Sequence, residues 1–501
     1  MSKVYNLILV LGLIFSFLLM FLGKVFLFLE IQMFSLNSFN WLWVIKIDAF
    51  SSIFSSVVLI ISLLIFFYSM EYMKMEKEIV PFFIYLWLFV ISMLVLIFSF
   101  NLSSILLGWD GLGVTSFMLI LYYNSVKSVN SSLITILINR MGDLMIIFSI
   151  ITCMIFISWN SMFWYDKKFF GLILLMAASL TKSAQIPFSY WLPKAMAAPT
   201  PVSSLVHSST LVTAGAYLMF RLNIMWTTIF LISSLTLLVS SVMGVLSFDF
   251  KEIIAFSTMS HISFMFMSLY NSNSFGPFFF HLNSHALFKA LLFMCSGYLI
   301  FFNSGLQDIR KIDFMLFNYK LKLSFMIASY SMMGLPFLSG FYSKEMVIED
   351  NLYSKFNLIF SFSILLTSLY TMRLIIYMHM NTAFGVISLK SKFMINSIYI
   401  LTWFSILFGS LFQWLCLSLT FIYHCMYMKL VMFFYLIFGL FSMMNEKPNF
   451  MKLFYYNLSK VYKIFMEMMK KNNFFFVLEK GWLKFFVLVM LFTLKEEYKK
   501  Q

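Results

Sequence analysis

Long uninterrupted runs of apolar residues restrict the fold of this chain more than any other feature of its sequence. Segments such as 48–69, 80–100 and 277–302 consist largely of Phe, Leu, Ile, Met, Val and small residues. Each has the length of about 20 residues that an α-helix needs to cross the hydrocarbon core of a bilayer. A transmembrane β-barrel would show shorter segments of alternating polarity. The runs therefore predict transmembrane α-helices.

Composition extends this prediction to the whole chain. Of the 501 residues, 62% are hydrophobic and only 11% are charged, whereas about 25% are charged in a typical soluble protein. Such a chain has too few polar groups to cover its own surface in water. We expect an all-α polytopic membrane protein with about 15 transmembrane helices, at approximately 4–24, 48–69, 80–100, 102–123, 133–157, 169–190, 200–222, 226–247, 252–270, 277–302, 321–343, 356–380, 393–417, 426–444 and 474–494.

The charge and the cysteines point away from nucleic acids and from redox chemistry. The net charge is +15, but the basic residues are mostly Lys at the ends of apolar runs, where they suit anionic headgroups and the positive-inside rule. The four cysteines are far apart, and the sequence has neither a metal-binding cysteine spacing nor a nucleotide-binding glycine motif. The abundance of Phe (65) and Met (40) is typical of an AT-rich genome and suggests a mitochondrial origin.

Two places interrupt the helical pattern. Four of the eight prolines lie between Pro187 and Pro201, and Gly334-Leu335-Pro336 interrupts the run 321–343. Proline removes a backbone donor, and broken helices at membrane depth are tolerated only inside protein or beside a wet cavity. Matching interruptions in two halves of a chain are typical of transporters with inverted repeats. We therefore expect broken helices at Pro187 and Pro336.

The same pattern divides the chain into regions. We expect N-terminal membrane helices at 1–79, a first repeat at 80–225, a second repeat at 226–380 and further membrane helices at 381–445. Lysines and apolar residues alternate with helical period in 446–473, which predicts an amphipathic helix along the membrane surface. A final transmembrane helix and tail follow at 474–501.

Ionisable side chains inside the apolar runs are the candidate functional residues, because each is costly in lipid unless it is paired or hydrated. Asp110 lies in Gly-Trp-Asp-Gly-Leu-Gly, and Lys182 follows a long apolar run. Arg140 and Asp143 are spaced i, i+3 and can neutralise each other on one helix face. Asp110 could instead be a carboxylate at a loop end, Lys182 could reach the headgroups, and Arg140–Asp143 could be purely structural.

A row of titratable groups follows in the second half of the chain. His281, His285 and Lys289 have the spacing i, i+4, i+8, which places them along one helix face over about 12 Å. His207 and His261 lie in neighbouring runs. Imidazoles at this depth can hold water and pass protons; an HxxxH pair could also bind a metal, and two histidines could bind haem.

Basic and acidic residues continue beyond the second interruption. Lys344 and Glu345 follow it directly, Arg373 lies inside the run 356–380, and Lys251 precedes the run 252–270. Along the bundle the order is thus an acid (Asp110), a base (Lys182), the imidazoles, a base (Lys344) and an acid (Glu345). This order favours vectorial proton movement over catalysis on a substrate carbonyl.

Several strings resemble the antiporter-type subunits of respiratory complex I, NADH:ubiquinone oxidoreductase. The match covers roughly residues 46–375. It is carried by the strings that begin at Gly108 (GWDGLG), Asn139 (NRMGD), Lys182 (KSAQIPF), Ala195 (AMAAPTPVS), Leu205 (LVHSSTLVTAG), Ala255 (AFSTMS), His285 (HALFKALLF), Gln307 (QDIRK) and Gly340 (GFYSKE).

The resemblance implies a fold, a site and partners. It implies two inverted five-helix repeats with a central polar axis, and a lateral helix that braces neighbouring subunits. In it Asp110 pairs with the broken-helix Lys182, Lys289 lies between two half-channels, and Lys344 is the basic residue of the second half. Asp143, His207, His281 and His285 belong to the same axis.

It also implies an environment. The partners would be the other membrane-arm subunits of complex I, above all the adjacent antiporter-like ones, and lipids that include cardiolipin, in the mitochondrial inner membrane. No cofactor is expected on this chain, because NADH, FMN, iron–sulfur clusters and ubiquinone would be bound by partner subunits.

Two other functions fit the same residues. The large subunit of a multi-subunit Na⁺/H⁺ antiporter shares these strings, and co-purification with redox subunits would decide between the two. The chain could also be a structural clamp subunit with a vestigial polar axis. Transport by variants of Lys182 and Lys344 would separate that possibility from pumping.

Overall fold

The computed structural model describes residues 27–36, 39–156, 170–223, 227–271, 276–312, 314, 319–351, 357–380 and 391–416. Within these ranges, nine helices are long and apolar enough to cross a membrane. The chain is therefore a multi-pass membrane protein with an α-helical fold, as predicted. The spans expected at 4–24, 426–444 and 474–494, and the amphipathic helix expected at 446–473, lie outside the described residues.

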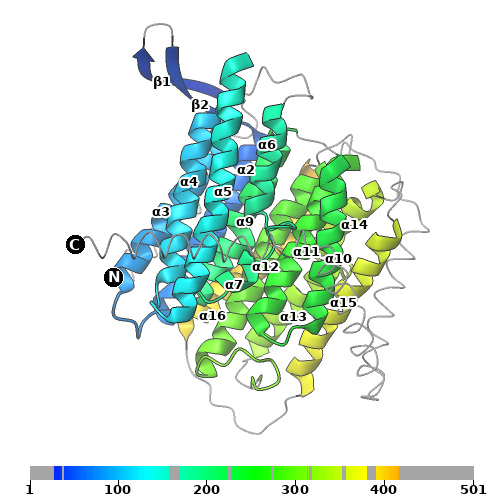
Figure 1. Ribbon diagram of the computed structural model, residues 1–501. Helices are drawn as coiled ribbons and strands as arrows, with labels where there is room; N and C mark the ends of the chain where they lie inside the picture. Colours follow the sequence, from blue (N-terminus) through cyan, green and yellow to red (C-terminus); the bar gives the residue numbers. More distant parts are fainter. Residues whose placement is uncertain are drawn as a thin grey trace, which may run out of the picture.

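A β-hairpin precedes the first described helix and was not predicted. Strands β1 (Leu27–Leu36) and β2 (Phe39–Ile47) pair antiparallel with Leu27 opposite Ile47, and the hairpin projects from one end of the bundle in Figure 1. Its sequence is rich in aromatic and β-branched residues, which favour strands. The predicted spans leave residues 25–47 unassigned, so the hairpin adds two strands to the predicted α-helical bundle.

The first half of the bundle consists of α2 and a set of helices with an interrupted segment. After α2 (Ala49–Tyr72) the set contains α3 (Ile79–Phe98), α4 (Leu102–Leu121), α5 (Val126–Phe156), α6 (Phe170–Lys182), α7 (Trp191–Ala195), α8 (Thr200–Val202), η2 (Ser203–Thr210) and α9 (Leu211–Arg221). The segment that begins with α6 is interrupted after Lys182, and the chain becomes helical again only at Trp191, where α7 begins.

The second half follows a similar order. It contains α10 (Thr227–Leu246), α11 (Phe250–Asn271), α12 (Gly276–Phe302), α13 (Tyr319–Met333), α14 (Ser339–Asn351) and α15 (Asn357–Met380), and α16 (Lys392–Cys416) comes after it. Here α13 and α14 are the two parts of an interrupted segment. In each half the interrupted segment is thus the fourth of five. An inverted relation between the halves stays a prediction.

Helix α12 occupies the centre of the molecule. It packs against α2, η2, α11, α13, α14 and α16, and Figure 1 shows it between the first-half and second-half helices. All of its residues from Pro277 to Ile300 are buried. Any polar side chain on α12 is therefore inside the protein, away from lipid.

The interruptions differ in detail from the predicted spans. Helix α6 ends at Lys182, not near residue 190, because Pro187 has no N–H and its ring would clash in a helix with the carbonyl four residues earlier, that of Ser183. The expected span 200–222 contains a π-helix, η2, in which Leu211 N–H donates to Val206 O. The span 321–343 is divided at Gly334, whose φ of +92° is typical of the residue that ends a helix.

A close helix contact fixes the end of α6. Gly215 on α9 faces the last turn of α6, and a Cβ at this position would lie 2.6 Å from Ser179 O and 3.1 Å from Ser183 N. Any side chain would push the two backbones apart. The glycine therefore sets the position from which Lys182 extends.

An ion pair attaches the hairpin end of the molecule to α9. Asp48 caps α2: its carboxylate accepts from Ser51 N at 3.0 Å, and its backbone N–H donates to Ser51 Oγ at 2.9 Å. Arg221 Nη1 lies 2.5 Å from Asp48 Oδ2, and Lys46 Nζ lies 3.4 Å from the same oxygen. Only 6% of the Arg221 side chain is exposed, so this guanidinium depends on Asp48 for charge compensation.

We expect Asp48→Ala to lower the free energy of unfolding by about 3 kcal/mol, because it removes a helix cap and leaves Arg221 buried without its partner. Lys46→Ala should cost less, about 1 kcal/mol, because Lys46 Nζ is 3.4 Å from Asp48 and its side chain is more exposed (18%) than that of Arg221. Thermal unfolding of the purified protein in detergent measures both. Equal losses for the two variants would contradict this account.

The same pair predicts a dependence on pH. Burial alone would raise the pKa of Asp48, but Arg221 and the hydrogen bonds from Ser51 outweigh burial and hold this pKa below its ordinary value. A lowered carboxyl pKa contributes stability at pH values above the unfolded pKa, and this stability is lost as the pH falls through the folded pKa. In Asp48→Asn this component of acid destabilisation should be absent.

Candidate functional site

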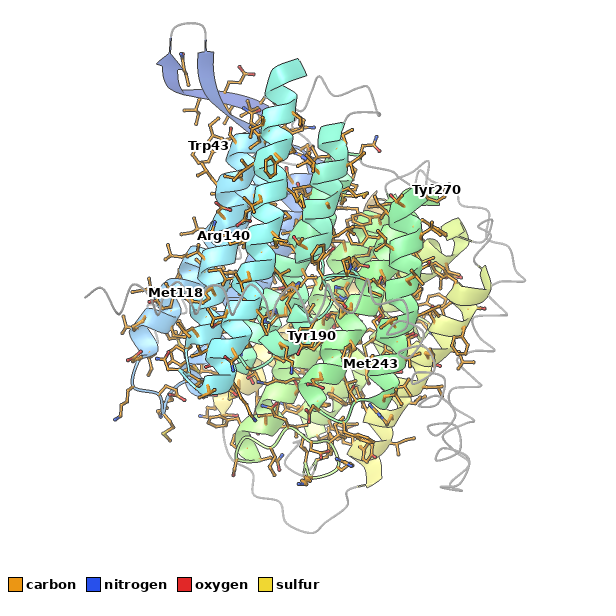
Figure 2. The ribbon with its side chains drawn as sticks, in the orientation of Figure 1. Trp43, Met118, Arg140, Tyr190, Met243 and Tyr270 are labelled. Atoms are coloured by element: carbon orange, nitrogen blue, oxygen red, sulfur yellow. The ribbon has the colours of Figure 1, made fainter. Side chains whose placement is uncertain are left out.

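The titratable side chains singled out in the sequence gather in the interior of the bundle. Lys182 and Lys289 are 0% exposed and Lys344 is 2% exposed. The other buried members are Asp143, His207, Lys251, His261, His281, His285 and Arg373. The interpretation of Lys182 as a side chain that reaches toward the headgroups is therefore wrong. Figure 2 shows how densely side chains fill the space between these helices.

Lys182 is held by the backbone and the ring of a tryptophan. Its Nζ donates to Trp109 O at 2.5 Å and lies 4.0 Å from the centroid of the Trp109 ring. Both contacts stabilise an ammonium without neutralising it. The last residue of α6 is thus joined to the middle of α4.

The acidic residues near Lys182 are arranged differently from the predicted Asp110–Lys182 pair. Arg140 Nη1 lies 3.2 Å from Asp143 Oδ2 and 3.7 Å from Asp110 Oδ2, and within the described ranges no ion pair joins Lys182 to Asp110. Asp143 and Asp110 are both close enough to Lys182 to attract its ammonium. Asp110 lies within α4, so it is not a carboxylate at a loop end.

This cluster reaches from the interior to the outside of the bundle. The Arg140 side chain is 51% exposed and that of Asp110 is 34% exposed, whereas only 6% of the Asp143 side chain is exposed. Figure 2 labels Arg140 about midway along α5. Asp143 is therefore the inner carboxylate and Asp110 the outer one, and Arg140, the most exposed of the three, contacts both.

Trp191 connects the end of α6 to the π-helix. Its Nε1 donates to Thr181 O at 2.9 Å, and its ring centroid lies 6.0 Å from that of His207. His207 is in η2, and irregular π turns occur frequently at functional sites. The residue next to Lys182 and the first buried histidine are thus linked through one indole.

Lys251 at the start of α11 holds the connection between α7 and α8. Its Nζ donates to Ala198 O at 2.9 Å and to Met196 O at 3.4 Å. These carbonyls lie in the proline-rich connection, where helical hydrogen bonds are missing. Lys251 therefore supports the backbone that leads into η2.

Three histidines form a cluster between α11 and α12. His261 Nδ1 lies 3.2 Å from His281 Nε2, and the ring centroids of His261 and His285 are 5.5 Å apart. All three rings are buried. The predicted row on α12 is present, and α11 adds His261 to it.

Lys289 lies one turn beyond His285 on α12. Its Nζ donates to Ser257 Oγ on α11 at 2.5 Å and to Met332 Sδ on α13 at 3.0 Å. A hydroxyl and a thioether are neutral, polarisable partners. The amine thus meets the end of α13 directly before the second interruption.

Lys344 occupies the other side of that interruption. Its Nζ donates to Thr367 Oγ1 on α15 at 3.0 Å and to Met333 O at 3.3 Å. The adjacent Glu345 is partly buried. The last two residues of α13 therefore contact the two lysines, Lys289 through Met332 and Lys344 through Met333.

Arg373 has a structural position. Its guanidinium donates to Val245 O at 2.5 Å, Ser247 O at 2.6 Å and Gly244 O at 3.1 Å. These carbonyls end α10, where a cation is favourable. Arg373 is thus a helix cap.

The described residues contain no group of three or more His, Cys, Asp or Glu side chains arranged to hold a metal ion. The amines and imidazoles have another capacity: each can bind and release a proton, and hydroxyls between them can pass protons on. The described elements from α5 to α15 therefore carry groups that can exchange protons.

Sequence reasoning missed several residues of this site. Trp109, Trp191, Ser257, Thr367 and Ser343 are uncharged, so a search for ionisable groups passes over them. Ser343 and Trp109 adjoin Lys344 and Asp110 in the sequence, and a hydroxyl or indole beside a buried charge is a usable signal. Ser257 and Thr367 approach their lysines only through the fold.

Two known protein families match most of the described chain. The family described as "NADH:quinone oxidoreductase/Mrp antiporter, TM" matches residues 99–371, and "NADH-Ubiquinone oxidoreductase (complex I), chain 5 N-terminus" matches residues 33–83. These two stretches include the hairpin strand β2 and every charged residue and histidine of the site except Arg373.

Curated relatives extend the match. NADH-ubiquinone oxidoreductase chain 5 of Aedes aegypti is 42% identical over 409 residues, which is 77% of this chain and 70% of the relative. The protein of the same name from Anopheles gambiae is 42% identical over 453 residues, or 86% of this chain and 77% of the relative. That from Locusta migratoria is 45% identical over 365 residues, or 69% and 63%.

Two solved structures share the fold. A chain of the Mrp complex from Dietzia sp. has a TM-score of 0.74 at 19% identity, over 97% of this chain and 60% of that one. A chain of an archaeal membrane-bound sulfane sulfur reductase has a TM-score of 0.72 at 17% identity, over 81% and 88%. At these identities the likeness concerns the fold alone.

Proposed function

Because this chain belongs to the family of NADH-ubiquinone oxidoreductase chain 5, we propose that it is a proton-translocating subunit of the membrane arm of complex I. Protons move through the buried row of amines, carboxylates and imidazoles. Electron transfer from NADH to ubiquinone in partner subunits drives this movement. The redox groups, NADH, FMN, iron–sulfur clusters and ubiquinone, belong to those partners.

One observation carries the proposal: three lysines are fully enclosed, and each donates to neutral groups. The partners are Trp109 O for Lys182, Ser257 Oγ for Lys289 and Thr367 Oγ1 for Lys344. A buried ammonium without a carboxylate in contact is expensive. A permanent ion pair would serve stability, whereas an amine in this state is ready to exchange its proton when a nearby charge moves.

The cluster around Arg140 supplies such a movable charge. Arg140 contacts both Asp143 and Asp110, so a shift of its guanidinium toward Asp110 frees Asp143 to attract Lys182. A return of Arg140 to Asp143 weakens that attraction. Lys182 is thereby charged in one arrangement and releases its proton toward His207 and Lys289 in the other.

The residues favour protons over sodium as the transported ion. Sodium, like other hard cations, is bound by several oxygen ligands, whereas the described interior presents the ammonium groups of Lys182, Lys289 and Lys344, which repel a metal cation. The fold shared with the Mrp complex is compatible with either ion. The ammonium groups of the interior are the feature that favours protons over sodium.

The proposed location is the mitochondrial inner membrane, where the chain assembles with the adjacent antiporter-like subunits. Lysines at the helix ends suit anionic headgroups, among them cardiolipin. Arg140 is half-exposed and Asp110 is one-third exposed on the outside of α4 and α5. Lipid tails offer these charged groups no partner, whereas a neighbouring protein or a lipid headgroup does.

Purification of the intact complex from its membrane tests the proposal. The chain should co-purify with NADH-oxidising activity, and vesicles of that complex should acidify on addition of NADH and ubiquinone at equal rates with and without sodium. Co-purification without redox activity, together with sodium-dependent acidification, would show the Na⁺/H⁺ antiporter instead. Unchanged acidification when Lys182 and Lys344 are both replaced by Met would show the structural clamp.

A further inference from the structure

Ser343 lies where the histidine cluster meets α14, and its hydroxyl has three polar contacts of 3.1 Å or less besides a longer one of 3.5 Å to Gly340 O. The Ser343 Oγ is 3.0 Å from His281 Nδ1, 2.9 Å from Ser284 Oγ and 3.1 Å from Ser339 O. Its side chain is fully buried. The hydroxyl therefore joins α12 to the helix that carries Lys344.

Hydrogen counting assigns a direction to these contacts. A hydroxyl has one hydrogen and two lone pairs. If Ser343 donates to Ser339 O, it accepts from His281 Nδ1–H and from Ser284 O–H, which then gives up its longer bond of 3.2 Å to His281 O, and all three contacts of Ser343 are hydrogen bonds. If Ser343 donates to His281 instead, it gives up the bond to Ser339 O.

The direction of the hydrogen bond between Ser343 and His281 also determines how His281 bonds to His261. With its proton on Nδ1, His281 presents a lone pair at Nε2, which accepts from His261 Nδ1–H across 3.2 Å. In the opposite direction His261 would carry its proton on Nε2, an atom with no hydrogen-bond partner among the described residues. A buried N–H without an acceptor is costly, so the first arrangement is favoured at both ends.

We propose that Ser343 is a positioning residue that holds His281 in the Nδ1–H tautomer, so that His281 Nε2 accepts a proton from His261. This inference rests on the proposed function, because it specifies a step in the same proton path. Ser343 acts through His281 and does not itself carry the proton.

The step is balanced in protons and charge. The His261 imidazolium loses the proton on Nδ1, and a new N–H bond forms on His281 Nε2. His261 is left neutral with its remaining proton on Nε2, the form that is disfavoured at rest, and His281 becomes the imidazolium. The two N–H groups of His281 then donate, one to Ser343 Oγ and the other to His261 Nδ1. Lys289, Lys344 and His285 are the other titratable groups near this pair.

The test uses the assembled complex with isotope-labelled histidine. Infrared spectroscopy distinguishes the two neutral imidazole tautomers, and subtraction of the spectrum of His281→Gln identifies the His281 band. Wild type should show the Nδ1–H form. Ser343→Ala should show a mixture of tautomers and a fall of about tenfold in NADH-driven proton movement, in proportion to the loss of one hydrogen bond that orients the ring. Ser343→Thr, which keeps the hydroxyl, should restore both.

Ser263→Ala is the matched control, because Ser263 is a buried serine on α11 whose hydroxyl donates only to Ser260 O, at 2.7 Å. It should change neither the tautomer nor the proton movement. A pure Nδ1–H signal in Ser343→Ala would overturn the inference. A changed tautomer with normal proton movement would support the positioning by Ser343 but contradict the proposed path through His281, so the two failures are distinguishable.

Discussion

Lys182→Met is expected to reduce proton translocation through this chain on the order of 10²-fold, the loss typical when a group that transfers a proton is removed. Methionine fills a similar volume, but its thioether neither binds nor releases a proton. The complex should still assemble, because replacement of a buried charge by an apolar side chain of similar size is often neutral for stability. Asp143 keeps Arg140 as its partner at 3.2 Å.

Acidification of vesicles during NADH oxidation measures this effect, and native electrophoresis measures assembly. Lys194→Met is the matched control: Lys194 lies on α7 close to the same interruption, but its side chain is exposed. It should pump at the wild-type rate. Normal pumping by Lys182→Met, in a complex that contains the chain, would remove Lys182 from the path.

Lys289→Met should have an effect of similar size for a different reason. Lys289 contacts Ser257 on α11 and Met332 on α13, and it lies on the central helix between the histidine cluster and the second interruption. Its loss interrupts the row between the half that contains Lys182 and the half that contains Lys344. Proton transfer should again fall on the order of 10²-fold.

Two comparisons make the Lys289 prediction specific. Lys320→Met changes an exposed lysine on α13 and should leave pumping unchanged. Ser257→Ala removes the hydroxyl that accepts from Lys289 but leaves the amine, so its effect should be smaller than that of Lys289→Met. An equal loss in Lys320→Met and Lys289→Met would indicate a general effect of lysine removal on the membrane domain.

Most of the helical fold was predictable because lipid permits few solutions. A backbone in hydrocarbon must satisfy its own hydrogen bonds, so the apolar runs identify helices such as α10 and α15 to within a few residues. Strands β1 and β2 were missed because a search for apolar runs of about 20 residues does not register strands of 10 and 9 residues. The π-helix η2 was missed because no sequence rule distinguishes it from an α-helix of the same residues.

The candidate site was predictable as a set of residues but not as a set of pairs. A charged side chain inside an apolar run is costly in a membrane, so Lys182, Lys289 and Lys344 can be identified as candidates from the sequence alone. Their partners depend on how helices far apart in the chain meet: Lys182 contacts Trp109 instead of Asp110, and Lys344 contacts Thr367 on the next helix. The ion pair of Arg140 with Asp143 was predictable, because it depends only on helix periodicity.

The most direct test of the central claim is an experimental density map of the assembled membrane arm in which ordered water is visible. If protons cross through this chain, waters must connect the amines and imidazoles that do not touch each other. We expect water molecules within hydrogen-bond distance of Lys182, His207 and Lys289, in a continuous row through the bundle. Dry side-chain packing between these three residues, with no water beside any of them, would contradict proton transfer along this route.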